Sequence, residues 1–370
     1  MGIVADVTLS TSAVSFDDLL KKYDGFMAPT AKLKLNGEDA VNAGMAITSV
    51  RVSTSTSVDT DTAVVTIGNA YDEIDRKLEW YGKFKLGNTM EVELGYKDKL
   101  KTVFSGYVTA VHFQYPKEGT PTVALTGMDM SFKLMRGQKI RTWKEKKVSD
   151  VAKEIASEYG LTAEVDDTGT KLPYLAKGYR SDFQFLQDLA LTHNYEFFIV
   201  GKKLYFRKRF KTKTPVITLK YMYNLHEFTL EHNLSEQVSG VEVHGWNVKE
   251  QKRIVGTSNS VDKINKLPKT GPNILTSMGS GDFVEHVYAN PETQSDANNL
   301  AKAILNARAL KLVSGEGETV GLPELRAGVF IKVEGLSSEL DESYYVSRAT
   351  HLLDQSGYIT QFQVQGNAVT

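Results

Sequence analysis

The chain of 370 residues contains no cysteine. This absence excludes thiol catalysis, disulfide frameworks, cysteine-ligated zinc and iron–sulfur clusters. Long apolar runs are also missing: the best candidate, residues 195–200, is interrupted by Glu196, and a membrane helix needs about 20 apolar residues. The N-terminus has no cationic segment followed by an apolar one. We therefore expect a soluble protein that is made in the cytoplasm and does not insert into membranes.

An excess of charge of either sign is lacking as well. Lys and Arg number 44 and Asp and Glu number 45, so the formal net charge is -1. Such a chain matches neither the field of nucleic acid nor that of a charged membrane, and we expect no stable nucleic-acid binding. Apolar residues make up 41% of the chain, which is enough for a core, and the length favours two or three domains.

Sequence signatures of catalysis are absent too. The seven histidines form no HExxH pair, and no serine stands in a G-x-S-x-G context. The closest approach to a ligand cluster is His226, Glu227, Glu231 and His232, whose side chains would divide between the two faces of a strand. The sequence therefore predicts no catalytic, cofactor-binding or metal-binding residues, no cofactor and no enzymatic activity.

Two segments resemble binding motifs only loosely. Residues 315–321 contain three glycines, but Glu316 and Glu318 would repel a phosphate, so we interpret the segment as a linker. The basic run of residues 202–213 has aromatic residues interleaved with its Lys and Arg residues. Either it faces a negatively charged partner, or it is a solvated hairpin whose aromatic side chains pack inward.

Alternation of apolar and polar residues predicts short strands through the first third of the chain. The clearest of these strands are residues 31–35, 47–52, 63–67, 90–94, 104–113 and 122–126. Strands at this spacing indicate a small β-barrel over residues 1–140, which we expect to be completed by strands from about residues 215–248.

The pattern then changes to helical periodicity. An apolar helical face spans Val148–Tyr159 and is followed by Gly160, which suits a helix C-terminus. Ser181 and Gln184 have the spacing of a capping box at the start of a second helix, and a hairpin follows. We expect residues 141–210 to form an α+β insert.

The last part of the chain returns to strands. Residues 249–313 are predicted to form an excursion, which is a polar loop up to Pro272 and ends in a long connecting helix over Pro291–Val313. Residues 314–370 are predicted to form a second small β-barrel.

The chain also repeats itself weakly. Three segments of the first third correspond in order, length and glycine stops to three near the end: Met90–Gly95, Tyr107–His112 and Thr122–Gly127 to Val329–Gly335, Tyr345–His351 and Phe362–Gly366. Either all small barrels share this pattern, or the chain contains two copies of one barrel.

The fold class that follows is α+β and β-rich: two similar small β-barrel domains with an α+β insert and a long linking helix. We expect Met90–Leu94 and Val329–Val333 to lie in separate barrels and to form their docking edges.

Several segments in this order resemble a known family. They are Leu94–Tyr96, Val103–Val108, Leu125–Asp129, Ser181–Ala190, Tyr195–Phe198, Leu204–Phe206 and Gly321–Gly328. The chain resembles the baseplate hub of contractile phage tails and injection systems, that is, the late control protein D family, and it is similar to the N-terminal hub part of VgrG proteins.

This resemblance implies a homotrimer, a ring in which three chains present six barrels to the sixfold inner tube and adapt it to a threefold spike. The implied partners are the tail tube or a tube-initiator protein, a separate spike protein, other baseplate proteins and a tape-measure protein. Because VgrG proteins continue into a spike and this chain stops at Thr370, we expect the spike to be another polypeptide.

The implied location is a virion or an extracellular tail-like particle, assembled from protein made in the bacterial cytoplasm. The alternative function is that of a tail-associated cell-wall hydrolase or a carbohydrate-binding protein.

Overall fold

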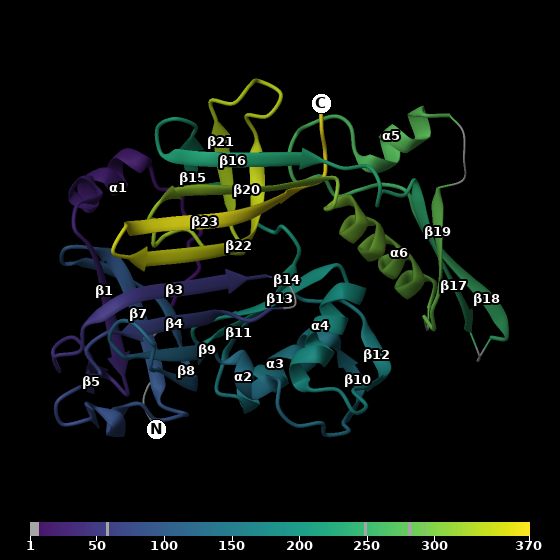
Figure 1. The fold of residues 1–370 in the computed structure, drawn as a ribbon. Helices are drawn as coiled ribbons and strands as arrows, with labels where there is room; N and C mark the ends of the chain where they lie inside the picture. The colour runs from purple at the N-terminus through teal and green to yellow at the C-terminus, as the bar shows by residue number, and fades with distance from the viewer. Residues whose placement is uncertain (1–6, 57–58, 248–249, 280–282, 292) are drawn as a thin grey trace.

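The computed structural model describes residues 7–56, 59–247, 250–279, 283–291 and 293–370. Strands dominate it, and its largest sheet has 13 strands (Figure 1). The chain therefore has a β-rich α+β fold, as the sequence predicts. None of the described helices is long and apolar enough to cross a membrane.

Strands from the first third of the chain form one part of this sheet, here called the N-terminal unit. They are β1 (Pro29–Leu35), β3 (Ile47–Ser55), β4 (Thr62–Ile67), β7 (Thr89–Tyr96), β8 (Lys99–Gln114) and β9 (Thr122–Met128). They lie in the order β3-β4-β9-β8-β7-β1. Alternation explains the strands: Ala63, Val65 and Ile67 of β4 are buried while the residues between them are half-exposed.

A second set of strands, the C-terminal unit, repeats this arrangement. They are β15 (Pro215–Lys220), β16 (Leu225–His232), β20 (Val313–Val320), β21 (Phe330–Glu334), β22 (Ser343–Asp354) and β23 (Gly357–Gly366). Their order in the sheet is β16-β20-β23-β22-β21-β15. If the strands of each unit are numbered along the chain, both units have the same order in the sheet: second, third, sixth, fifth, fourth, first. One pairing differs, because β1 and β7 are antiparallel whereas β15 and β21 are parallel.

The irregularities of the two units also correspond. Thr48 of β3 and His226 of β16 are each an extra residue in the ladder with the next strand, and so are Thr109 of β8 and Ser347 of β22. Alternation alone does not require β-bulges at matching places. The shared strand order and the shared bulges therefore support the duplication much more strongly than the sequence pattern does.

Closed barrels are not found. The pairing runs from β16 through both units to β2 (Glu38–Asp39) without returning to its first strand among the described residues. Strand β22 pairs with β3 of the N-terminal unit, and one hydrophobic cluster contains residues of both units, such as Leu33 and Val333. Alternation shows which side chains are buried but not which strand lies alongside, so the sequence could not reveal this continuity.

The expectation that strands from residues 215–248 complete the first barrel is wrong. Strands β15 and β16 pair with β21 and β20, and therefore belong to the C-terminal unit. Strand β17 (Gly240–Asn247) lies in a separate sheet between β18 (Lys252–Ser258) and β19 (Val284–Tyr288). The polar stretch after residue 249 thus contains a strand, in which Gly256 lies so close to the backbone of Ala297 that a Cβ would clash.

The glycine-rich segment 315–321 is not a linker. Gly315 and Gly317 lie in β20, between β16 and β23. A Cβ on Gly317 would lie 2.7 Å from the ring of Phe362, so glycine here allows close packing within the sheet. The preceding helix is α6 (Gln294–Ala309), which ends before Val313 because β20 begins there.

Residues 142–208 form most of a second hydrophobic cluster, to which Met130 and Leu134 also belong. Their elements are β10 (Thr142–Lys147), α3 (Val148–Glu158), β11 (Thr162–Val165), β12 (Lys171–Ala176), α4 (Asp182–Thr192), β13 (Tyr195–Val200) and β14 (Lys203–Lys208). The predicted capping box is confirmed: the Ser181 hydroxyl accepts from the Gln184 backbone N–H at 3.2 Å, and the side-chain Oε1 of Gln184 accepts from the Ser181 backbone N–H at 3.1 Å. Helix α4 packs on β13, with Phe185 and Leu186 buried.

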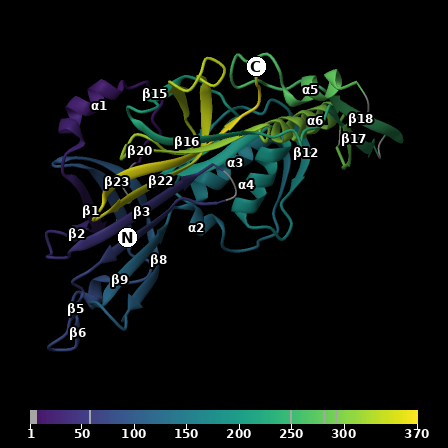
Figure 2. The same ribbon diagram turned by 45° about the horizontal axis from the view of Figure 1, so that its top comes forward.

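The shorter elements lie around this framework. They are α1 (Phe16–Lys22), η1 (Asp24–Phe26), β5 (Tyr71–Asp72), β6 (Lys77–Leu78), η2 (Tyr81–Lys83), α2 (Ser131–Leu134) and α5 (Gly271–Ser277). Helix α6 covers the small sheet of β17, β18 and β19, and this layer lies far from the β5–β6 hairpin (Figure 2).

A buried ionic group joins the two units. The guanidinium of Arg326 lies 2.6 Å from the carboxylate of Asp61, and both side chains are buried. The carboxylate of Asp129, which accepts from the Ser131 N–H at 2.9 Å, lies in the same group. Burial, and then the nearby charge of Asp61, raise the pKa of Asp129 to about 7.

We predict that Leu186→Ala destabilises the protein. The side chain is fully buried in the cluster of residues 142–208, and truncating a buried leucine costs about 2–5 kcal/mol. Leu191→Ala is the matched control, because Leu191 lies on the same helix and is 51% exposed. Thermal unfolding should show a lower midpoint for Leu186→Ala than for the control, and equal midpoints would contradict this core assignment.

A second prediction concerns pH. Because the folded state holds the Asp129 proton more tightly than the unfolded chain, the contribution of Asp129 to the free energy of unfolding should fall as pH rises from about 4 to about 7. Asp129→Asn removes this titration and should flatten the profile in that window. Chemical denaturation at a series of pH values measures it, with Asp75→Asn as the exposed control. An unchanged slope in Asp129→Asn would refute the assignment.

Candidate assembly surface

The junction between β3 and β22 shows how one unit joins the next. The two strands pair antiparallel over residues 50–55. The hydroxyls of Ser53 and Thr350 lie 3.1 Å apart across the junction, and the Thr56 N–H donates to the Ser347 carbonyl at 3.1 Å. Side chains and backbone thus both bridge the two units.

The core side of this junction is buried. Val52 and His351, which are opposite each other, are both fully buried. The imidazole Nδ1 of His351 lies 2.9 Å from the Tyr358 hydroxyl and 3.1 Å from that of Thr360. Burial, and next the charge of Arg326, lower the pKa of His351 to about 3, so this histidine is neutral at physiological pH.

Polar contacts fix the end of the junction. The Ala327 N–H donates to the Thr54 hydroxyl at 3.0 Å, beside the ion pair of Arg326 and Asp61. Arg348 pairs with Asp59 at the surface. Since these contacts come from the segment before β21 and from both paired strands, they hold the two units in one relative position.

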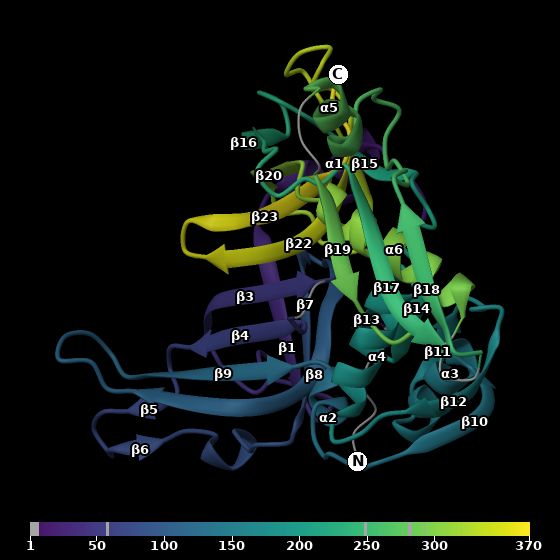
Figure 3. The same ribbon diagram turned by 90° about the vertical axis from the view of Figure 1, so that its right-hand side faces the viewer.

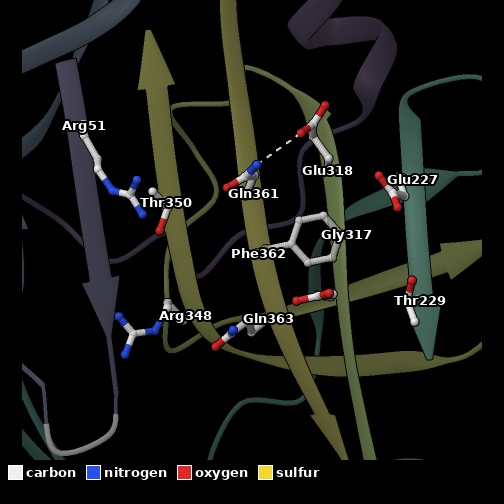
Figure 4. Close-up of a pocket in the computed structure, with 11 residues that line it drawn as sticks. Arg51, Glu227, Thr229, Gly317, Glu318, Arg348, Thr350, Gln361, Phe362 and Gln363 are labelled. Carbon is white, nitrogen blue, oxygen red and sulfur yellow. Dashed lines mark hydrogen bonds between the residues drawn. The ribbon is translucent and has the colours of Figure 1, made fainter. Parts of the chain in front are cut away.

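The opposite face of the sheet is polar. An open hollow of about 290 Å³ spans β16, β20, β23, β22 and β3, with Arg51 and Arg348 on one side and Glu227 and Glu318 on the other (Figure 4). The Gln361 amide donates to Glu318 at 3.3 Å. The described residues that line it include no histidine or serine, so it offers no pair of nucleophile and base of the usual kind. The hollow is therefore a polar, solvent-accessible surface.

Two strand edges end this row of strands. Figure 3 shows β16 at one end and β8 at the other, with β20, β23, β22, β3, β4 and β9 between them. Strand β16 pairs with β20 alone among the described strands. On its β7 side, β8 is bonded as far as Val108, whose N–H donates to the Asn88 carbonyl at 2.8 Å. No described strand pairs with that side of residues 109–114.

The strands predicted as docking edges are not edges. Met90–Leu94 lies in β7, between β1 and β8, and Val329–Val333 corresponds to β21, between β15 and β22. The two segments lie in different units and do not pair with each other, although one continuous sheet contains both. The edges differ from the prediction because strand order depends on long-range pairing.

The histidine cluster considered from the sequence does not converge. His226, Glu227, Glu231 and His232 are spread along β16, with exposed side chains. Their contacts lead to residues outside the set: the Asn233 amide donates to Glu231 at 2.9 Å, and Glu318 lies 3.8 Å from the Nδ1 of His226.

A different group meets on the small sheet. The Nε2 of His244 lies 3.1 Å from the Nδ1 of His286, and each nitrogen lies 3.4 Å from a Glu242 carboxylate oxygen. The sequence analysis missed it because parallel pairing of β17 and β19 brings together residues about forty positions apart.

Arg253 bears on which ring nitrogen of neutral His244 carries the proton. Its guanidinium lies 2.8 Å from the Nδ1 of His244. A guanidinium only donates, so this nitrogen accepts, and neutral His244 must carry its proton on Nε2 and donate it to His286. A metal-bound histidine would instead need an acceptor at its second nitrogen. The contacts of the group thus form a hydrogen-bond chain, and the absence of a metal site stays a prediction.

The basic run of residues 202–213 is largely engaged within the chain. The Arg207 guanidinium lies 2.6 Å from Glu196, and the Lys213 ammonium donates to the Lys263 carbonyl at 2.6 Å. Phe206 and Phe210 are buried. These contacts favour the interpretation of a solvated hairpin whose aromatic side chains pack inward.

Two solved structures with a similar fold are described as tail proteins. The 43 kDa tail protein of prophage MuSo2 from Shewanella oneidensis has a TM-score of 0.70 and 14% identity, over 91% of this chain and 98% of that one. A tail protein from Neisseria meningitidis has a TM-score of 0.68 and 14% identity, over 91% and 96%. No curated protein matches the sequence.

A third similar structure is a component of the E. coli type VI secretion system, with a TM-score of 0.57 and 9% identity over 91% of this chain and 77% of that one. It is described as similar to the T4 bacteriophage tail proteins gp27 and gp5. At the level of sequence, residues 27–355 match the family described as the Alg8 N-terminal domain. That match covers most of the chain, which therefore belongs to the Alg8 N-terminal domain family.

Proposed function

We propose that this protein is the structural hub of a baseplate in a contractile phage tail or a tail-like injection particle. Three copies form a ring that adapts a sixfold inner tube to a threefold spike. The tail proteins that share the fold, and the secretion component described as similar to T4 tail proteins, support the proposal. So does the resemblance of the sequence to late control protein D and to the hub part of VgrG.

The observation that carries this function is the duplicated unit. Both units have the same strand order and matching bulges at Thr48 and His226 and at Thr109 and Ser347. A ring of three chains with two units each presents six similar surfaces to a sixfold partner. The same ring offers only three copies of every other surface, which suits a threefold partner.

The role is structural rather than catalytic. The hollow in the polar face is lined by charged and amide side chains, and the buried His351 is held neutral by its surroundings. The partners are accordingly other tail proteins: the tube or its initiator, a separate spike protein and neighbouring baseplate proteins. Among the described residues, no observation favours the alternative of a tail-associated cell-wall hydrolase or carbohydrate-binding protein.

Native mass spectrometry tests this function. The purified chain should give three times the mass of the monomer of 41.1 kDa, and a further species should form with the cognate spike protein. An assay on peptidoglycan should show no turnover. A chain that stays monomeric at all concentrations, or one that degrades peptidoglycan, would contradict the proposed hub.

A further inference from the structure

We infer that β8 of one copy pairs antiparallel with β16 of the next copy, and that this pairing repeats between chains the β3–β22 junction within the chain. The inference rests on the proposed ring of three copies and assigns the contact that closes it. Its occupant is a second copy of this chain, because the two unpaired edges belong to the strands equivalent to those at the junction: β8 corresponds to β22 and β16 to β3.

The bulges set the register of this contact. Counted from Thr109 and Ser347, His112 corresponds to Thr350. Counted from the bulges in β16 and β3, Glu231 corresponds to Ser53. Thr350 and Ser53 are opposite each other at the junction. His112 should therefore lie opposite Glu231 of the partner subunit.

The same register aligns the neighbouring residues. Phe113 corresponds to His351 and Leu230 to Val52, which are opposite each other at the junction. Phe113 should therefore face the partner subunit's Leu230. An apolar pair on the core face next to a histidine and a carboxylate on the polar face is a favourable cross-strand combination. The histidines of the two repeated segments, His112 and His351, are consequently not equivalent.

Burial supports this contact independently. Val52 and His351 are fully buried where the junction exists. Their counterparts Leu230 and Phe113 are only partly buried and pack against the edge of the same core. A partner strand alongside each open edge would cover Leu230 and Phe113, as the junction covers Val52 and His351. It would also supply hydrogen-bond partners for the backbone groups at both edges.

The geometry is head-to-tail, because the two edges lie at opposite ends of the row in Figure 3. Such contacts generate a closed ring or an open filament. With two equivalent junctions per chain, one internal and one between copies, closure at three copies places six units around one axis.

Disulfide trapping tests the register. The chain has no cysteine of its own, so His112→Cys combined with Glu231→Cys introduces the only thiols. Residues opposite each other in antiparallel strands have Cα separations that a disulfide accepts. Mild oxidation should shift the protein from monomer to covalent trimer on a non-reducing gel, with no larger species.

Two matched variants complete the experiment. Ser53→Cys with Thr350→Cys occupies the equivalent positions of the internal junction. This pair should form a disulfide within one chain, so the protein should still run as a monomer on the non-reducing gel. His112→Cys with Glu227→Cys is displaced by four residues and should leave the protein uncrosslinked.

The outcomes separate this inference from the proposed function. Trimers by native mass spectrometry without the His112–Glu231 crosslink, while the internal pair does crosslink, would overturn the inference and leave the ring of three intact. Equal crosslinking of the displaced pair would overturn the register. Covalent oligomers larger than trimers would show that the contact forms a filament and not a ring. A protein that remains monomeric would overturn both the inference and the proposed function.

Discussion

A β-strand leaves one row of backbone N–H and C=O groups on each side, and these groups need partners. In this protein the junction of β3 and β22 supplies partners for the strands at which the two units meet. Without it, the fold would be two separate open sheets, each with a half-covered core. With it, the sheet is continuous and one hydrophobic cluster extends through both units.

The residues around the junction stabilise one specific geometry. Burial of His351 and Val52 excludes water from the core side, while the ion pair of Arg326 and Asp61 fixes the segment before β21 against the N-terminal unit. A buried ion pair contributes little net stability, since desolvation offsets its attraction, but it penalises any alternative register that would leave one charge unpaired. We regard this as a means of specifying how the units are placed.

The remaining segments form separate small sheets beside this row of strands. Residues 142–208 pack around their own cluster, and α6 covers the small sheet of β17, β18 and β19. The ion pair of Glu196 and Arg207, with the Tyr345 hydroxyl donating to Glu196 at 2.6 Å, ties the first of these segments to the C-terminal unit. Additional structure can be attached in this way without altering the edges that end the row.

Local patterns in the sequence were sufficient for local structure. The capping box of Ser181 and Gln184, the alternation in β4 and β9 and the helical face that begins at Val148 each depend on residues within a few positions of one another. The repeat was visible for the same reason, because its segments are contiguous. These features predict a β-rich α+β chain, and they indicate an internal repeat without deciding between a duplication and a pattern common to small barrels.

The edges and the junction were decided by the tertiary structure alone. Met90–Leu94 was predicted to be an edge strand, yet β1 and β8 flank it. The residues of β18 form a strand by pairing with β17, and Gly256 allows that strand to approach α6 closely. Likewise, β15 and β16 follow the segment of residues 142–208 but pair with strands near the C-terminus. Alternation of side chains shows which face of a strand is buried. The pairing of two strands depends instead on backbone N–H and C=O groups, which nearly every residue carries, so the sequence does not determine which strand lies alongside.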